Sequence, residues 1–306
     1  MLALLFPGQG SQRPGMGAPW QGHPSWKLTE EVADASGRDV ASLLLDVDTD
    51  TLKATRNAQL AAFTLSLVIL DAARAEGLDQ ASVVAGAGHS LGEYSALVAV
   101  GVLSVAEGAR LVAARGEAMQ AAADVAPGTM AAILGLDADL VVQSCADVEG
   151  SWVANDNAPG QIVIAGTASG VDAAGANAKK RGAKRVMALA VGGAFHSPLM
   201  ASAQSDLDSA LAAATWGGAH APVVANVDAV AHDDGWSDLL SRQLVSPVRW
   251  RESMLALPQL GVTITVELGP GSELSGMVKR TLDGVERAHV AKPEDLAAVA
   301  GLGESR

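Results

Sequence analysis

Short apolar runs separated by longer helical stretches are the feature that most restricts the fold of this 306-residue chain. Leu2–Phe6 and Ser82–Ala85 are interpreted as buried strands, because each is short, apolar and followed by glycine or proline-glycine. Residues 51–75 and 91–100 have helical composition. Strands that alternate with helices predict an α/β protein with a mainly parallel sheet.

The middle of the chain has a different pattern. It predicts three short strands that alternate with two helices, at residues 130–136, 138–146, 161–165, 171–181 and 185–190. A β-α-β-α-β run of about 65 residues has the size of a ferredoxin-like unit. Strands near 223–227 and 263–268 then continue the α/β pattern. We therefore expect a large α/β subdomain from residues 1–123 and 193–306, with a smaller one inserted at 124–192.

The composition argues against several classes of function and location. The formal net charge is −13, so the chain as a whole is a poor binder of nucleic acid or of an anionic membrane. Its one cysteine, Cys145, allows no internal disulfide and fits a reducing compartment. The start has no basic segment typical of a signal peptide, and the apolar stretch Ala61–Leu70 is too short to span a membrane. We expect a cytoplasmic protein without nucleic-acid or membrane partners.

The pentapeptide GHSLG at residues 88–92 matches the nucleophile elbow G-x-S-x-G. In an elbow, a strand, a sharp turn and a helix together expose a serine hydroxyl at the edge of the sheet. A strand-like run precedes this pentapeptide and a helix-like run follows it, as the elbow requires. The helix also directs its N-terminal N–H groups toward developing negative charge. Ser90 is therefore the candidate nucleophile, and the alternative is an ordinary serine in a turn.

The longer string GHSLGEYSAL at residues 88–97 resembles the nucleophile segment of malonyl-CoA:acyl carrier protein transacylases and of related acyltransferase domains in polyketide and fatty acid synthases. Four other segments resemble this family in the same order, namely FPGQGSQ at 6–12, RGEAM at 115–119, GAFH at 193–196, and QLVSPVRW at 243–250 together with ELGPG at 267–271. The resemblance implies an α/β-hydrolase-like large subdomain, a ferredoxin-like insertion and an active site in the cleft between them.

The resemblance also implies how Ser90 would be activated. A serine hydroxyl needs a base, and spacing alone cannot choose among the six histidines, at 23, 89, 196, 220, 232 and 289. The family pattern selects His196, with the main-chain carbonyl of Gln243 orienting the imidazole in place of a catalytic aspartate. It implies an oxyanion hole made by the backbone N–H groups of Gln9 and Leu91.

Three further residues are matched to substrate binding by the resemblance. Arg115 would bind the malonyl carboxylate through two parallel hydrogen bonds. Asn155 would line the site, with Asn157 as the runner-up, and the alternative is a turn-forming cluster of Asn and Asp. Phe195 precedes the histidine and resembles the form of the family that selects malonyl over methylmalonyl. From composition alone, Arg115 would be a solvated surface residue.

The expected reaction transfers malonyl from malonyl-CoA to the phosphopantetheine of an acyl carrier protein, which is acidic. Two basic clusters are candidates for docking it, Lys179, Lys180, Arg181, Lys184 and Arg185 on the one hand and Lys279 with Arg280 on the other. No metal or resident cofactor is indicated, and we expect a monomer. The alternatives are the malonyl transferase subunit of malonate decarboxylase, a serine thioesterase or esterase, and a non-catalytic acyl-binding protein.

Overall fold

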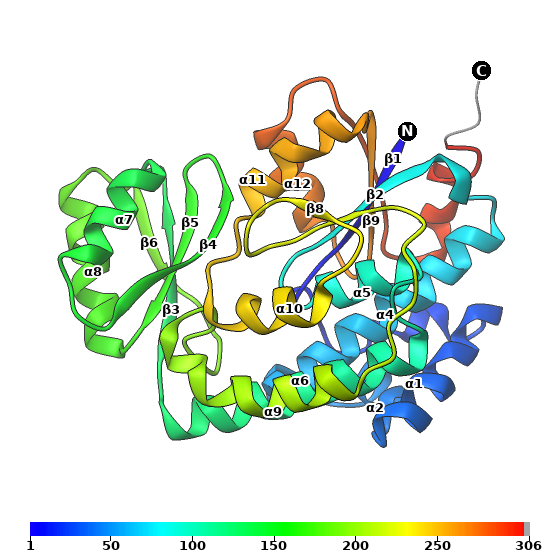
Figure 1. Cartoon of the computed structure of the whole chain (residues 1–306), viewed down its shortest axis with the longest axis horizontal. Helices are drawn as coiled ribbons and strands as arrows, with labels where there is room; N and C mark the ends of the chain where they lie inside the picture. Colours follow the sequence, from blue (N-terminus) through cyan, green and yellow to red (C-terminus); the bar gives the residue numbers. More distant parts are fainter. Residues whose placement is uncertain (303–306) are drawn as a thin grey trace.

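Two β-sheets organise the chain in the computed structural model, which describes residues 1–302 (Figure 1). The larger sheet has the strand order β10-β9-β1-β2-β7-β8, and only β8 runs antiparallel to its neighbour. The strands span Glu286–Val290 (β10), Ile264–Leu268 (β9), Leu2–Phe6 (β1), Val83–Gly88 (β2), Val223–Val224 (β7) and Ala231–His232 (β8). The expected α/β fold with a mainly parallel sheet is confirmed.

Helices cover both faces of this sheet. They are α1 (Leu28–Ser36), α2 (Val40–Leu45), α3 (Thr49–Lys53), α4 (Thr55–Ala75), α5 (Gly92–Ala99), α6 (Val105–Val125), α9 (Ala201–Ala213), α10 (Trp236–Val245), α11 (Trp250–Ala256) and α12 (Glu273–Thr281). Short 3-10 helices lie at Ala18–Trp20, Pro24–Lys27, Gln80–Ser82, Pro198–Met200, Leu257–Leu260 and Pro293–Ala298.

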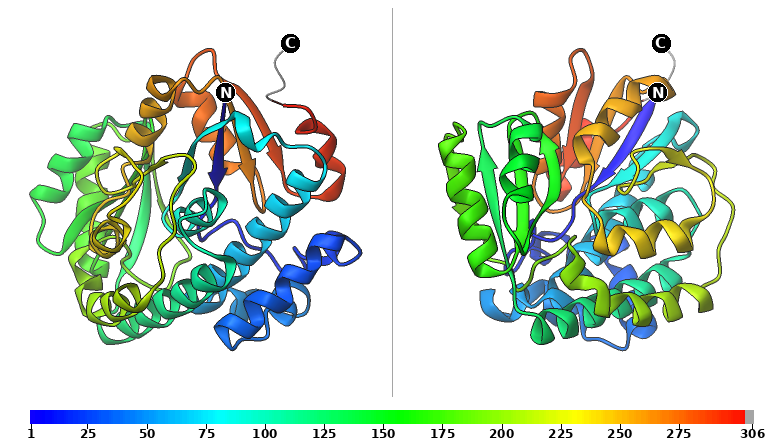
Figure 2. Two further views of the ribbon diagram at one scale, coloured as in Figure 1. Left: turned by 45° about the vertical axis from the view of Figure 1, so that its right-hand side comes forward. Right: turned by 60° about the vertical axis from the view of Figure 1, so that its left-hand side comes forward.

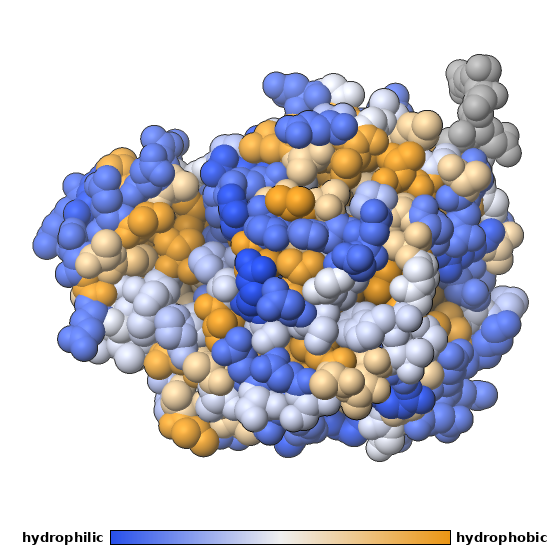
Figure 3. All heavy atoms as spheres, in the orientation of Figure 1, coloured by the Kyte–Doolittle hydropathy of each residue, from blue (hydrophilic) through white to orange (hydrophobic). Residues whose placement is uncertain are grey.

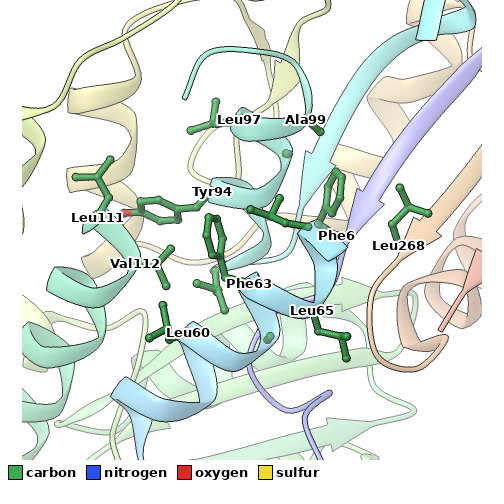
Figure 4. Close-up of a cluster of buried hydrophobic side chains, with 14 of the residues drawn as sticks. Phe6, Leu60, Phe63, Leu65, Tyr94, Leu97, Ala99, Leu111, Val112 and Leu268 are labelled. Atoms are coloured by element: carbon green, nitrogen blue, oxygen red, sulfur yellow. The ribbon is translucent and has the colours of Figure 1, made fainter. Parts of the chain in front are cut away.

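The central strand β1 shows why the sheet must be covered on both sides. Leu2, Leu4 and Phe6 belong to one hydrophobic core, and the intervening Ala3 and Leu5 belong to another. Successive side chains of a strand point to opposite faces, so a strand that is apolar at every position is buried on both faces of the sheet. Figure 4 shows the first core, where Phe6 at the end of β1 lies among side chains of α4 and α5.

Helix α4 is a 21-residue helix, most of whose residues are buried. By length and hydropathy it is the one helix in residues 1–302 that could cross a membrane, so the sequence argument from Ala61–Leu70 considered too short a segment. However, 83% of its most apolar window is buried inside the fold. In the structure α4 packs against α6 and the sheet as a core helix.

The smaller sheet is antiparallel, with the order β4-β5-β3-β6. Its elements are β3 (Thr129–Leu134), α7 (Ala138–Ala146), β4 (Ser151–Ala158), β5 (Gln161–Gly166), α8 (Ala168–Lys180) and β6 (Arg185–Ala188). This is the β-α-β-β-α-β arrangement of a ferredoxin-like unit, and it lies to one side of the large sheet (Figure 2). Its extent supports our proposed division of the chain at residues 124–192.

One strand of this unit was not predicted from the sequence. β4 reads SWVANDNA, and asparagine and aspartate have low β-propensity. The strand forms because β5 pairs along its length and because the segment before α11 pairs with it on the other side. Asp156 N–H donates to the Val248 carbonyl at 2.9 Å, and Val248 N–H donates to the Ala154 carbonyl at 2.8 Å. The strand therefore connects the small sheet to the large subdomain.

Candidate active site

Ser90 lies in the turn between β2 and α5, as the elbow pattern predicted. Its φ is 53°, a left-handed conformation that costs energy in residues other than glycine. The flanking glycines allow the tight turn. A Cβ at Gly88 would lie 1.9 Å from the carbonyl carbon of Gly92, and one at Gly92 would lie 2.0 Å from the Phe6 carbonyl oxygen. The elbow therefore closes against the end of β1 only because both positions lack side chains.

His196 lies beside the serine, although the two residues are 106 positions apart. The Ser90 Oγ to His196 Nε2 distance is 2.7 Å, and His196 Nδ1 lies 2.9 Å from the main-chain oxygen of Gln243. His196 also has a left-handed backbone, with φ 57°. Strained backbone that the surrounding structure maintains is a feature of functional sites.

The partners of Ser90 fix the direction of each hydrogen bond. Arg115 Nη2 donates to Ser90 Oγ at 3.0 Å, and a guanidinium can only donate. Nδ1 of His196 faces a carbonyl oxygen, which can only accept, so Nδ1 carries the proton. Nε2 is then free to accept the hydroxyl proton of Ser90. The arrangement presents the histidine tautomer that a general base requires.

Arg115 belongs to α6 and is 1% exposed, contrary to the surface position that composition alone favours. Nη1 donates to Gln59 Oε1 at 2.6 Å, and Nη2 also donates to Gln243 Oε1 at 3.0 Å. Within residues 1–302, no carboxylate lies within salt-bridge distance of Arg115, and its buried Nε has no partner. A buried cation without an anion is costly, so this site is suited to an anionic ligand.

The glycine after Arg115 allows the arginine to be buried. A Cβ at Gly116 would lie 2.8 Å from Cα of Arg56 in α4. The close approach of α6 to α4 explains why a residue unfavourable within helices occupies this position.

The electrostatics of the site keep the base neutral. Burial, and then the nearby positive charge of Arg115, lower the pKa of His196 to about 3. An imidazole in this environment is unprotonated at neutral pH and can accept a proton. An anion bound to Arg115 would offset the positive charge and make the imidazolium less costly.

These groups open into a cavity of about 370 Å³ between the two subdomains. Ser90, Arg115, Phe195 and His196 line the large-subdomain side. The small sheet supplies the opposite side with Met130, Ala132, Asn155, Asn157, Gln161 and Val163. The other face of that sheet packs on α7 and α8. The small subdomain thus uses one face for its own core and the other for the cavity.

Asn155 and Asn157 both reach the cavity, because residues two apart in a strand share a face. Asn157 Oδ1 is 2.8 Å from His89 Nε2, so Asn157 links the small sheet to the elbow. The Asn155 side chain makes no hydrogen bond with any described residue and remains available to a ligand. Asp156, between them, points away and pairs with Arg251 at 2.7 Å.

The two N–H groups expected to form an oxyanion hole are free. Gln9 lines the cavity, and Leu91 follows the nucleophile at the start of α5. Neither N–H donates to another group in the described part of the chain. These two unpaired donors beside the half-buried Ser90 are available to a ligand oxygen that could accept from both.

The two basic clusters have different relations to the cavity. Lys179 and Lys180 end α8, on the side of the small sheet that faces away from the cavity. That outer edge is mainly hydrophilic (Figure 3), and Arg181 there pairs with Asp147 at 2.5 Å. By contrast, α12 lines the cavity with Met277 and carries the exposed Lys279 and Arg280 in its last turn. This second cluster therefore lies on a helix that lines the cavity, whereas the first does not.

Comparison with known proteins agrees with this geometry. The family model of the acyl transferase domain matches residues 3–301. The chain belongs to the acyl transferase domain family. A malonyl CoA-acyl carrier protein transacylase of Bacillus subtilis is 43% identical to this chain, and the match covers 96% of this chain and 95% of the Bacillus protein. The protein of the same name from Escherichia coli K12 is 39% identical over 98% and 99% of the two chains.

Solved structures of such enzymes have the same fold as this acyl transferase domain. A malonyl-CoA:acyl carrier protein transacylase from Xanthomonas oryzae superposes with a TM-score of 0.93 at 39% identity, covering 98% of this chain and 97% of the other. A malonyl-transacylase in complex with a type II polyketide synthase acyl carrier protein also gives 0.93, at 36% identity and 98% coverage of both chains.

Sequence reasoning missed several buried polar residues around the site of this family member. Gln59 in α4, Glu93 in α5 and Asn226 after β7 are buried and hydrogen-bonded to site residues. Only Glu93 gave a usable signal, since an ionisable residue in an otherwise apolar helix next to a nucleophile is unusual. Within residues 1–302, no group of three or more His, Cys, Asp or Glu side chains is arranged to hold a metal ion.

Proposed function

We propose that this acyl transferase moves malonyl from malonyl-CoA to the phosphopantetheine thiol of an acyl carrier protein through an ester on Ser90. The observation that carries the proposal is that the Ser90 hydroxyl contacts both His196 and Arg115, at 2.7 and 3.0 Å, inside one cavity. A malonyl group has a reactive carbonyl at one end and a carboxylate at the other, so it needs these two partners close together. The names of the relatives support the same reaction.

In the first half-reaction, Ser90 Oγ attacks the thioester carbonyl while its proton passes to His196 Nε2. The C–S bond then breaks, and His196 returns the proton to the departing CoA thiolate. In the second half, His196 takes the proton of the carrier thiol, whose sulfur attacks the ester carbonyl. The ester C–O bond breaks and the proton goes back to Ser90. CoA thus leaves before the carrier thiol reacts, and Ser90 holds the malonyl group in between, which is a ping-pong mechanism.

Each remaining group has a defined part in these steps. Arg115 exchanges its bond to the Ser90 hydroxyl for bonds to the malonyl carboxylate. The Gln243 carbonyl keeps the His196 ring oriented and stabilises the imidazolium when it forms. The N–H groups of Gln9 and Leu91 stabilise the oxyanion, a contribution of about 3–4 kcal/mol per donor in comparable sites.

Asn155 and Phe195 shape the space around the acyl group. Asn155 offers an amide on the small-sheet side, and the ring of Phe195 occupies the side next to the base. A bulky ring there leaves little room for an α-methyl branch, so we propose selection of malonyl over methylmalonyl. Equal kcat/KM values for the two thioesters would refute this part.

We further propose that the carrier docks at Lys279 and Arg280. Acyl carrier proteins are acidic, and these two exposed cations end the helix that lines the cavity. The double charge reversal K279E/R280E should raise the KM for the carrier several-fold at low salt and spare malonylation of Ser90. The matched variant K179E/K180E tests the other cluster, and a larger effect there would move the docking site to α8.

Intact-protein mass spectrometry tests the central proposal. Mixing the protein with malonyl-CoA should add one malonyl group, and adding a phosphopantetheinylated carrier should move that mass to the carrier. Release of free malonate without carrier labelling would indicate a thioesterase or esterase. Transfer only to the carrier of a malonate decarboxylase would indicate a subunit of that enzyme, and absence of any adduct would indicate an acyl-binding protein.

A further inference from the structure

We propose that Glu93 is a positioning residue that fixes the side-chain amide of Gln243 and thereby holds Arg115 in place for the malonyl carboxylate. The residue follows the nucleophile by three positions, in the first turn of α5, and is completely buried. It does not touch the cavity, so it acts through its neighbours. The inference rests on the proposed function, because it concerns how Arg115 is presented to the substrate.

The two oxygens of Glu93 each accept one short hydrogen bond. The main-chain N–H of Asn226 donates to Oε1 at 2.6 Å, and Gln243 Nε2 donates to Oε2 at 2.6 Å. Asn226 in turn accepts from Ser90 N–H through Oδ1 at 2.7 Å, and Gln243 Nε2 donates to the Ser90 carbonyl at 2.9 Å. One carboxylate therefore connects the two residues whose side chains hold the peptide groups of the nucleophile.

The donors around Glu93 determine the orientation of the Gln243 amide. A carboxylate that already accepts from a backbone N–H can only be matched by another donor, so it selects the NH2 end of the glutamine. The oxygen end of Gln243 must then face Arg115, where Nη2 donates to Oε1 at 3.0 Å. A flipped amide would place NH2 against the guanidinium, donor against donor, and would push Arg115 from its position.

The hydrogen bonds to Glu93 suit its charged form. Burial raises the pKa of its carboxyl to about 8 and so favours the neutral acid at pH 7, while the hydrogen bonds from Asn226 and Gln243 and the charge of Arg115 favour the carboxylate. Since both neighbours are donors, the geometry matches the carboxylate rather than the acid. The carboxylate also supplies a negative charge to a buried cation that makes no direct ion pair, with one amide between the two.

The test compares malonyl with acetyl transfer in E93Q, which keeps the shape and replaces one acceptor by a donor. We expect kcat/KM for malonyl-CoA to fall by about 10- to 100-fold, as for other groups that orient site residues. Acetyl has no carboxylate for the guanidinium to bind, so the loss in acetylation of Ser90 from acetyl-CoA should be about tenfold smaller than the loss for malonyl. S95A is the matched control, because Ser95 is buried in the same helix and its Oγ has no partner; its malonyl-to-acetyl ratio should stay unchanged.

A second variant gives an independent readout. Q243M removes the amide but keeps the main-chain carbonyl, and it should lower the malonyl-to-acetyl ratio even if E93Q does not fold. If both fold, E93Q/Q243M should be no worse than Q243M within about threefold, because the two residues act in one chain. An unchanged ratio in E93Q or in Q243M, or losses that multiply, would overturn the role of Glu93.

R115A separates this inference from the proposed function. If the malonyl-to-acetyl ratio of kcat/KM collapses in R115A but stays unchanged in E93Q, only the positioning role of Glu93 is refuted. A ratio that persists in R115A refutes the role of Arg115, and the inference about Glu93 with it.

Discussion

The two sides of the cavity are built differently. On the large-subdomain side, Ser90, Arg115 and His196 are joined by a continuous buried network that includes Gln243. On the small-sheet side, half of the lining residues of the sheet are apolar, and Asn155 makes no hydrogen bond within the described residues. The first side fixes where bonds form and break, and the second fixes the shape of the space. Changes on the first side should therefore reduce the reaction itself, and changes on the second should adjust its selectivity.

The largest effect is expected from removing the reactive pair. S90A should abolish the malonyl adduct, and H196A should slow its formation by at least about 10⁴-fold, as in related serine enzymes. Both groups serve one proton transfer, so each is needed for the ester to form at a normal rate. Quench-flow mass spectrometry measures the adduct, and a malonyl adduct that persists in S90A or forms at the normal rate in H196A would contradict these roles.

Truncating the guanidinium should have the next largest effect. R115A leaves a malonyl carboxylate buried without its partner, which costs about 3–4 kcal/mol, or roughly 10²–10³-fold in kcat/KM. Acetyl transfer should change by less than about tenfold, because acetyl has no carboxylate. Measurement of kcat/KM with both malonyl-CoA and acetyl-CoA gives the difference, and equal losses would show that Arg115 does not bind the carboxylate.

The sequence predicted the large-subdomain side better than the small-sheet side. Ser90, His196 and Arg115 lie in strings that resemble a family, and the structure brings them together at hydrogen-bond distances. β4 was missed because local composition favours a turn there, and the strand depends on partners distant in sequence. Gln59 could not be found either, since it looks like any other polar residue of a helix until α4 and α6 are packed.

A smaller effect is expected on the small-sheet side, where it also decides between two asparagines. N155A should lower kcat/KM for malonyl-CoA by about tenfold through the loss of one hydrogen bond to the substrate. N157A should act mainly on stability, because its amide is already paired with His89. Thermal unfolding and kinetics on both variants separate the two, and a reversed pattern would make Asn157 the substrate ligand.

The smallest effect concerns pH. His196 has a lowered pKa of about 3, so the neutral base predominates at all higher pH values. Between pH 7.0 and 5.5, kcat/KM for malonyl-CoA should change by less than about threefold, whereas a histidine with a pKa near 6.5 would lose about eightfold. Stopped-flow malonylation across this range measures it. An acid limb with an apparent pKa near 6.5 would mean that the base is better hydrated than the structure indicates.

The attachment of β4 has a consequence for how substrates enter. Asp156 contributes its N–H to Val248 and its carboxylate to Arg251, while the adjacent Asn155 faces the cavity. Hinge-like opening of the two halves would sever these bonds and displace a ligand-facing amide at once. A substrate should instead slide into a preformed slot, so we expect turnover not to wait on a large domain rotation.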